Sequence, residues 1–151
     1  MAVLFLDTSA LVRRYDPAEP GAAQVRAYCR RSSGHTLPIA AITTVEIASA
    51  LARKERDGAL SASQAQRLWR SFRRDYRERY ESVALGSAVL RQAERLLFAH
   101  RLRAYDALQL SSALAAQAAF RLLTSDFRFC TADHRQATTG EVAGLRVELI
   151  R

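Results

Sequence analysis

Four acidic residues lie where the sequence pattern changes from strand to helix. Asp7 ends the apolar run "AVLFLD" and Asp133 ends the run "FRFCTAD". Glu46 lies one turn into the helical segment that follows a second extended stretch, and Asp106 opens the helical stretch "YDALQLSSALAAQAAF". In open parallel sheets the ligand crevice lies outside the carboxyl ends of the strands. We therefore expect these four carboxylates to converge at one sheet edge.

Helix capping is the competing explanation for each acid taken singly. A carboxylate near a helix N-terminus accepts hydrogen bonds from free N–H groups and complements the positive end of the helix dipole. Three pairs have the spacing of a capping box: Thr43 with Glu46, Asp106 with Gln109, and Asp133 with Gln136.

Taken together, the four acids point to a metal. Anions brought within a few ångströms repel one another and raise one another's pKa unless a cation neutralises them. Hard oxygen ligands in that number favour Mg²⁺ or Mn²⁺ over zinc. Such an ion suits phosphodiester hydrolysis, because the substrate phosphate supplies its remaining ligands. We expect the carboxylates of Asp7, Glu46 and Asp106 to share one cation.

The elements that must position these acids alternate along the chain. Strand patterns cover residues 2–7, 35–44, 81–86, 127–133 and 145–150, with Pro38 making the second strand short or irregular. Helical patterns cover residues 9–17, 20–34, 43–58, 61–80, 87–102, 105–120 and 134–144. This alternation predicts an α/β fold with a central, mainly parallel sheet of four to five strands and helices on both faces. Residues 1–151 are expected to form a single domain.

The charge of the chain is compatible with a polyanionic partner. Lys and Arg total 23 against 15 Asp and Glu, a net charge of +8, and nearly all the cations are arginine. Arginine makes bidentate contacts with phosphate, although an arginine-rich surface also arises without any such role. Charge alone therefore leaves nucleic-acid binding open.

Other sequence features exclude several classes of protein. No basic segment precedes the first apolar run, which Asp7 interrupts, so we expect neither a signal peptide nor a membrane span, and a cytoplasmic location. Cys29 and Cys130 lack ligand spacing and are expected to be core thiols.

The acidic motifs resemble those of a known family. The chain is similar to the PIN-domain ribonucleases, and most closely to the VapC-type toxins of bacterial toxin–antitoxin pairs. The resemblance spans nearly the whole chain and rests on four segments: "LDTSALVRRY", "ITTVEIASALARKERDG", "LRAYDALQLSSAL", and "FCTAD" followed by "AGLRVE". It implies a PIN-like fold.

The resemblance also implies roles for individual residues. Asp7, Glu46 and Asp106 would be metal ligands, and Thr8 or Ser9 would orient Asp7 or hold a metal-bound water. For the fourth acid, Asp126 matches the pattern of shorter family members. We favour Asp133, which keeps the usual interval to Gly144 and follows a better strand pattern. Asp126 would then be a turn residue.

The activity implied by the family is that of an endoribonuclease. Mg²⁺ or Mn²⁺ would activate water for attack on an RNA phosphodiester, leaving a 5′-phosphate. His35, His100 and His134 have no partners at triad spacing, which disfavours a metal-free mechanism. The alternatives are a non-catalytic module that binds RNA or an antitoxin, and a PIN nuclease for RNA maturation or DNA ends.

Protein partners also follow from the resemblance alone. Such toxins form homodimers, and a small VapB-like antitoxin silences them by lying over the helices beside the active site, so a toxin–antitoxin hetero-oligomer is expected. The segments "GAAQVRAYCRR" and "TVEIASALARK" are candidates for the antitoxin groove, although their apolar faces are equally well explained as core.

Overall fold

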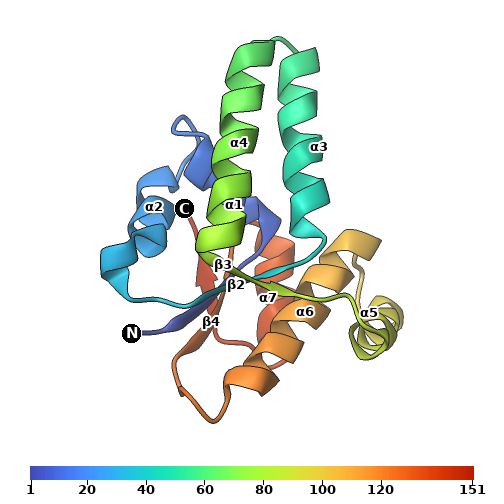
Figure 1. Ribbon diagram of the computed structural model, residues 1–151. Helices are drawn as coiled ribbons and strands as arrows, with labels where there is room; N and C mark the ends of the chain where they lie inside the picture. Colours follow the sequence, from blue (N-terminus) through green and yellow to red (C-terminus); the bar gives the residue numbers. More distant parts are fainter.

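Strands and helices alternate along the chain as predicted. The computed structural model describes residues 1–151 (Figure 1). The strands are β1 (Val3–Leu6), β2 (Leu37–Ala40), β3 (Tyr80–Val83), β4 (Phe127–Thr131) and β5 (Val147–Leu149). The helices are α1 (Thr8–Tyr15), α2 (Ala22–Cys29), the 3₁₀ turn η1 (Arg31–Ser33), α3 (Thr43–Arg56), α4 (Ala62–Glu78), α5 (Ser87–Ala99), α6 (Ala104–Phe120) and α7 (His134–Val142).

All strand pairings are parallel. Strands β1, β4 and β5 form one sheet in the order β1-β4-β5, and β2 pairs with β3 in a second. The two sheets meet at one parallel bridge between Val3 and Thr36. The α/β class with a parallel sheet is confirmed.

The prediction of a single sheet with four to five strands is wrong, because the structure has one sheet of three strands and a second sheet of two. The Thr36 N–H donates to the Ala2 carbonyl, whereas the Ala41 N–H donates to the Val83 carbonyl, so alternate residues of this segment face β1 and β3. Pro38 falls on the side facing β1 and has no N–H to donate. The ladder between β1 and β2 therefore does not extend beyond its first bridge.

Alternation along β1 creates two hydrophobic cores. Leu4 and Leu6 belong to a core formed with α1, α2, α3 and α4, while Val3 and Phe5 belong to a core formed with α5, α6 and β4. Because successive side chains of a strand point to opposite faces, this division places helices on both faces of the sheet. The two-layer covering predicted from the sequence is thus confirmed.

Two helical pairs frame the sheet. Helices α3 and α4 form a long hairpin that rises above the strands, and α5 lies beside α6 at the opposite margin (Figure 1). Ser61 and Gln64 form the predicted capping box at the start of α4, with both reciprocal hydrogen bonds present. No helix is both long and apolar enough to cross a lipid bilayer. Cys29 and Cys130 are buried and unpaired, as expected.

Gly140 lets α7 pack closely on the sheet. A Cβ atom at this position would lie 3.2 Å from side-chain atoms of both Phe129 and Val147. The close approach packs the C-terminal part of α7 against β4 and β5.

Candidate active site

The four predicted acids line one pocket at the carboxyl ends of the strands. Its volume is about 560 Å³, within the range of ligand sites. Its acidic lining residues come from the ends or starts of four elements: Asp7 after β1, Glu46 in α3, Asp106 in α6 and Asp133 before α7. The predicted convergence of the acids at one edge is therefore observed.

Asp7 is the most buried of these acids, with 2% of its surface exposed. It is the N-cap of α1, where Oδ1 accepts hydrogen bonds from Ser9 Oγ (2.7 Å) and the Ala10 N–H (2.9 Å). Oδ2 accepts one from Thr131 Oγ1 (2.6 Å). Burial raises the pKa of Asp7 to about 6, although these hydrogen bonds act in the opposite direction. Neutral donors thus hold the carboxylate in place without neutralising it.

Glu46 is half-buried and is held by two side chains. Its Oε1 accepts hydrogen bonds from Thr8 Oγ1 (3.0 Å) and Gln109 Nε2 (2.7 Å). Burial is the main cause that raises its pKa. Of the two hydroxyls expected to orient Asp7, Ser9 does so, whereas Thr8 contacts Glu46 instead. Gln109 Nε2 also lies 2.9 Å from Thr43 Oγ1, which ties α6 to the start of α3.

Asp106 lies in the first turn of α6, whose N-cap is Arg103. Burial raises the pKa of Asp106, and the nearby charge of Asp133 raises it further. Gln136 Nε2 lies 3.2 Å from the Asp106 carbonyl oxygen and 3.4 Å from its Oδ1. Helix α7 is thereby tied to the start of α6.

Asp133 is the N-cap of α7 and lies beside Asp106 in the pocket. Its Oδ1 accepts hydrogen bonds from the N–H groups of Arg135 (2.7 Å) and Gln136 (3.3 Å). Asp126 precedes β4, at the opposite end of that strand from Asp133, and accepts from Arg128 (2.8 Å) and Arg146 (3.2 Å). The pocket therefore contains Asp133 and not Asp126.

None of the three suggested capping boxes forms. The N-cap of α3 is Ile42, and that of α6 is Arg103, so neither Thr43 nor Asp106 caps its helix. Only Asp133 does so, and its Gln136 side chain reaches Asp106 rather than the cap backbone.

Three site residues were missed in the sequence: Gln109, Gln136 and Thr131. The repeated Asp-x-x-Gln spacing was the available signal for both glutamines, but it was interpreted as capping. In the structure each glutamine instead links two helices at the pocket. Thr131, two residues before Asp133, is the residue that contacts Asp7 across 124 positions of sequence.

The acids form a chain of neighbours rather than a single cage. The charge of Glu46 raises the pKa of Asp7, and the charge of Asp106 raises that of Glu46. No group of three or more His, Cys, Asp or Glu side chains is arranged to hold one ion. That Asp7, Glu46 and Asp106 share one cation stays a prediction. Each helix start carries a different acid, and this spreads the carboxylates along the pocket.

The donor set nevertheless fits Mg²⁺ or Mn²⁺. These ions are commonly bound by one or two carboxylates, with water and substrate phosphate as further ligands. The pocket offers carboxylate oxygens, and no cation of the protein forms a salt bridge with any of the four acids. The side-chain oxygens of Gln109 and Gln136 are buried without hydrogen-bond partners. The pocket is thus a hard-oxygen environment whose carboxylates form no salt bridge with the chain.

Arginines line the same pocket without forming salt bridges to its acids. Arg53 and Arg103 are lining residues, and the charge of Arg103 lowers the pKa of Asp106. None of the three histidines lines this pocket, and His134 is exposed. Acid–base chemistry through histidine therefore has no support here.

Comparison with known proteins identifies the domain. The family model described as the PIN domain matches residues 4–135. No curated protein matches the chain. Among solved structures, VapBC2 from Rickettsia felis, bound to a DNA fragment from their promoter, is 14% identical with a TM-score of 0.67, covering 99% of both chains.

Two further structures share the fold at low identity. PAE2754 from Pyrobaculum aerophilum is 19% identical with a TM-score of 0.65, covering 97% of this chain and 83% of that one. VapBC-1 from nontypeable Haemophilus influenzae is 12% identical with a TM-score of 0.60, covering 97% of each. With the family match extending over most of its length and all four acids, the chain belongs to the PIN domain family.

Proposed function

We propose that the protein is a Mg²⁺- or Mn²⁺-dependent endoribonuclease that acts as the toxin of a VapBC-type toxin–antitoxin pair. The observation that carries the proposal is the pocket in which Asp7, Glu46, Asp106 and Asp133 meet without a salt bridge to any cation of the chain. PIN domains are generally nucleases, which supports hydrolysis of a phosphodiester bond. Two of the similar structures are described as VapBC, which supports the toxin assignment.

Hydrogen bonds within the chain hold the acids of the site in position. Ser9 and Thr131 fix both oxygens of Asp7, while Thr8 and Gln109 hold Glu46. Carboxylates among Asp7, Glu46, Asp106 and Asp133 would hold the ion, which when bound would supply Lewis-acid activation of water and of the scissile phosphate.

Arginines of the pocket would attract the substrate. A phosphodiester approaching an acidic pocket is repelled unless cations surround the entrance. Arg53 and Arg103, which line the pocket, would contact its phosphates.

Metal-dependent RNA cleavage tests the proposal. The purified protein should cleave RNA with Mg²⁺ or Mn²⁺ and stop when EDTA is added. Asp133→Asn should lose most of this activity, whereas Asp126→Asn removes the same charge outside the pocket and should retain it. Equal activity of the two variants would overturn the assignment of the fourth acid. Salt-dependent RNA binding without hydrolysis would favour a non-catalytic binding module instead.

An antitoxin partner is the second part of the proposal. We expect a small VapB-like protein to bind over the helices beside the acidic pocket, and a homodimer of this chain to form the toxin unit. The two segments singled out in the sequence form α2 and most of α3. Both helices contact α1, whose N-cap is Asp7. Coexpression with the neighbouring small reading frame should yield a complex without RNase activity, and an active complex would contradict this part.

A further inference from the structure

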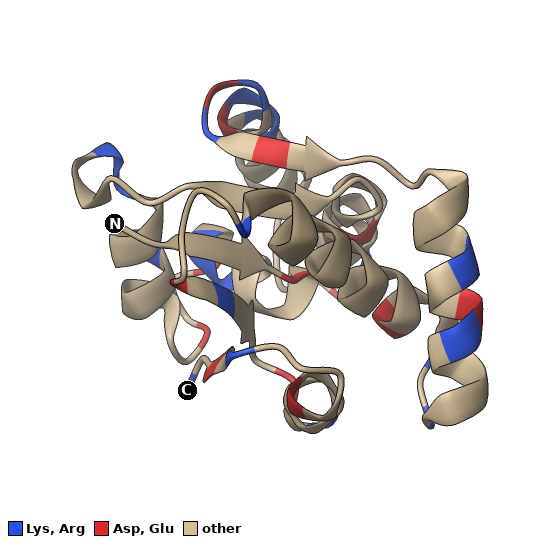
Figure 2. Ribbon diagram, turned by 90° about the horizontal axis from the view of Figure 1, so that it is seen from below, with Lys and Arg blue, Asp and Glu red and all other residues tan.

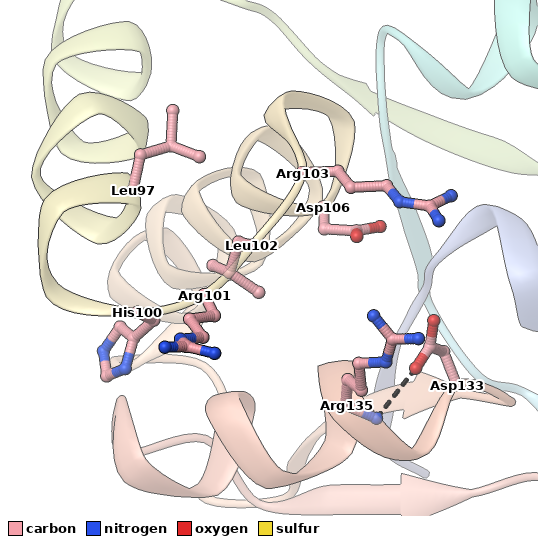
Figure 3. A pocket seen from close by; sticks show the side chains of 8 residues that line it. All are labelled: Leu97, His100, Arg101, Leu102, Arg103, Asp106, Asp133 and Arg135. Carbon is pink, nitrogen blue, oxygen red and sulfur yellow. Dashed lines mark hydrogen bonds between the residues drawn. The ribbon is translucent and has the colours of Figure 1, made fainter.

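A second hollow adjoins the acidic pocket where α5 is joined to α6. Its volume is about 700 Å³, and it shares three lining residues with the acidic pocket: Arg103, Asp106 and Asp133. Figure 3 shows Asp106 and Asp133 at one side of this hollow, with Leu97 and Arg101 across it. The two hollows therefore form one groove, with the acids in its middle.

The rim of this hollow, defined by Arg101, Arg103 and Arg135, is cationic. All three arginines are exposed, and none forms an ion pair with a carboxylate. Elsewhere in the protein, Arg14 and Arg128 are neutralised by Asp75 and Asp126. Guanidinium groups without internal partners are available to bind phosphate oxygens.

An apolar wall lies behind this rim. Leu97 is 38% exposed and Leu102 is partly buried against the core beneath α6. Both line the hollow, and Figure 3 shows Leu97 on α5 and Leu102 on the segment that leads into α6. A nucleotide presents this same combination, an anionic phosphate beside a flat base with an apolar face.

We propose that this hollow binds the nucleotide next to the scissile phosphate of single-stranded RNA. Arg101 and Arg135 contact the phosphate of that nucleotide, and the wall of Leu97 and Leu102 receives its base. A base stacked and paired in a duplex is not free to enter such a hollow, whereas an unpaired base is. The inference rests on the proposed nuclease function and adds the direction in which the RNA strand leaves the acids.

Electrostatics explains why the groove needs such a subsite. The acidic pocket repels a polyanion, so part of the binding energy must come from contacts away from the scissile bond. The rim of Arg101, Arg103 and Arg135 lines the same hollow as Asp106 and Asp133. The rim thus supplies the attraction that the acids lack.

The first experiment compares two double variants with the same charge change. Arg101→Ala/Arg135→Ala should raise KM for a short single-stranded RNA about tenfold while kcat stays within about twofold, since the lost contacts bind rather than react. The backbone N–H of Arg135, which donates a hydrogen bond to Asp133 Oδ1, is retained in this variant. Arg91→Ala/Arg95→Ala, on the exposed side of α5 where basic and acidic positions are mixed (Figure 2), should leave both constants unchanged.

A second experiment identifies the phosphate. Substrates carrying one uncharged methylphosphonate at either neighbour of the cleavage site are compared with the unmodified RNA. At one of the two positions the wild type should lose affinity, and Arg101→Ala/Arg135→Ala should show no additional loss there. Additive losses at both positions, or equal KM values for the two double variants, would overturn the subsite.

A binding measurement separates this inference from the proposed function. In the Asp7→Asn background, removal of Arg101 and Arg135 should reduce the salt dependence of RNA binding, by a slope of about 0.7 per lost phosphate contact. Absence of metal-dependent cleavage by the wild type refutes the nuclease and leaves this result interpretable. Cleavage combined with an unchanged salt slope refutes the subsite alone.

Discussion

Two buried aspartates, Asp7 and Asp75, lie at opposite ends of α1 and differ in the groups that bind their carboxylates. Asp75 of α4, 5% exposed, accepts hydrogen bonds from Arg14 Nε (2.9 Å) and the Tyr15 hydroxyl (2.9 Å) at the C-terminal end of α1. Asp7, 2% exposed, caps the N-terminal end and has only hydroxyl and backbone donors. One carboxylate has a cation from its own chain and the other has none.

The difference separates a structural charge from a functional one. When a buried carboxylate is paired with a cation of its own chain, its charge is already neutralised and a bound cation is not needed. A buried carboxylate held only by neutral donors keeps an electrostatic cost, which a bound cation would remove. Of these two aspartates, Asp7 is therefore the one whose ionised form an external cation would stabilise.

The largest expected effect is on catalysis at Asp7. Asp7→Asn keeps the shape of the side chain but removes its charge, and with it several kcal/mol of metal-dependent stabilisation, so RNA cleavage should fall about 1,000-fold or more. The melting temperature should be equal to or above that of the wild type, because an uncompensated buried charge is removed. Steady-state cleavage and thermal unfolding in EDTA check both parts; cleavage at the wild-type rate would remove Asp7 from the site.

Asp75→Asn should show the reverse pattern. It leaves the half-buried Arg14 without a carboxylate, and breaking a buried pair on one side costs about 3–5 kcal/mol of unfolding free energy. Urea unfolding measures this loss. The specific activity of the fraction that remains folded should be unchanged, and a stable variant would show that the two aspartates are less different than their contacts indicate.

These two aspartates also show how far the sequence alone could lead. Asp7 was predicted because a short apolar run ends at it, and the strand order then places it at the crevice. The network of Asp75 was not predicted, since Arg14 and Tyr15 lie about 60 positions away and only the packing of α4 on α1 unites them. Local patterns thus located the elements and the acids, whereas the partners that set each charge depend on tertiary contacts.

The same limit explains the errors at helix starts. Thr43 and Glu46 have the spacing of a capping box, but Gln109 from α6 takes the Thr43 hydroxyl and the Glu46 carboxylate. A capping rule cannot include a competitor 63 residues away. The sheet was misjudged similarly, because the effect of Pro38 depends on which neighbouring strand its missing N–H would face.

The pH dependence of stability should carry the signature of Asp7. Its pKa rises from 3.8 to about 6 on folding, so the folded state binds the proton more tightly than the unfolded state. Stability is therefore fully present below about pH 4 and is lost as pH rises through 6, by about 3 kcal/mol for this shift. In EDTA, the difference in unfolding free energy between wild type and Asp7→Asn should change by this amount, and parallel pH profiles would refute the assignment.

A metal ion should reverse that loss. Above pH 6 an ion that binds the ionised carboxylate of the folded state raises its stability by mass action. Mg²⁺ or Mn²⁺ should therefore raise the melting temperature of the wild type at pH 7.5 and leave that of Asp7→Asn unchanged. An equal rise for both proteins would indicate ion binding elsewhere.

A smaller effect is expected when one neutral donor is removed. Thr131→Val deletes the hydroxyl 2.6 Å from Asp7 Oδ2 and keeps the side-chain shape, so the pKa of Asp7 should rise further. Loss of such an orienting partner typically weakens metal affinity or activity by about 10–100-fold. Titration of cleavage with Mn²⁺ should show a higher half-saturating concentration, and an unchanged value would mean that Ser9 and Ala10 alone fix the carboxylate.

The smallest effect belongs to the satisfied network around Asp75. The Tyr80 hydroxyl lies 2.7 Å from that of Tyr15, which in turn donates to Asp75, so Tyr80→Phe removes only the far end of the chain of hydrogen bonds. The cost should be about 1 kcal/mol of unfolding free energy, that of one neutral hydrogen bond, with RNA cleavage unaffected. A change in the metal dependence of cleavage would show that the two ends of α1 are coupled, because no hydrogen bond joins the Tyr80 side chain to a residue of the acidic pocket. Unaltered cleavage together with a small stability loss would place the whole Asp75 network on the structural side of the comparison.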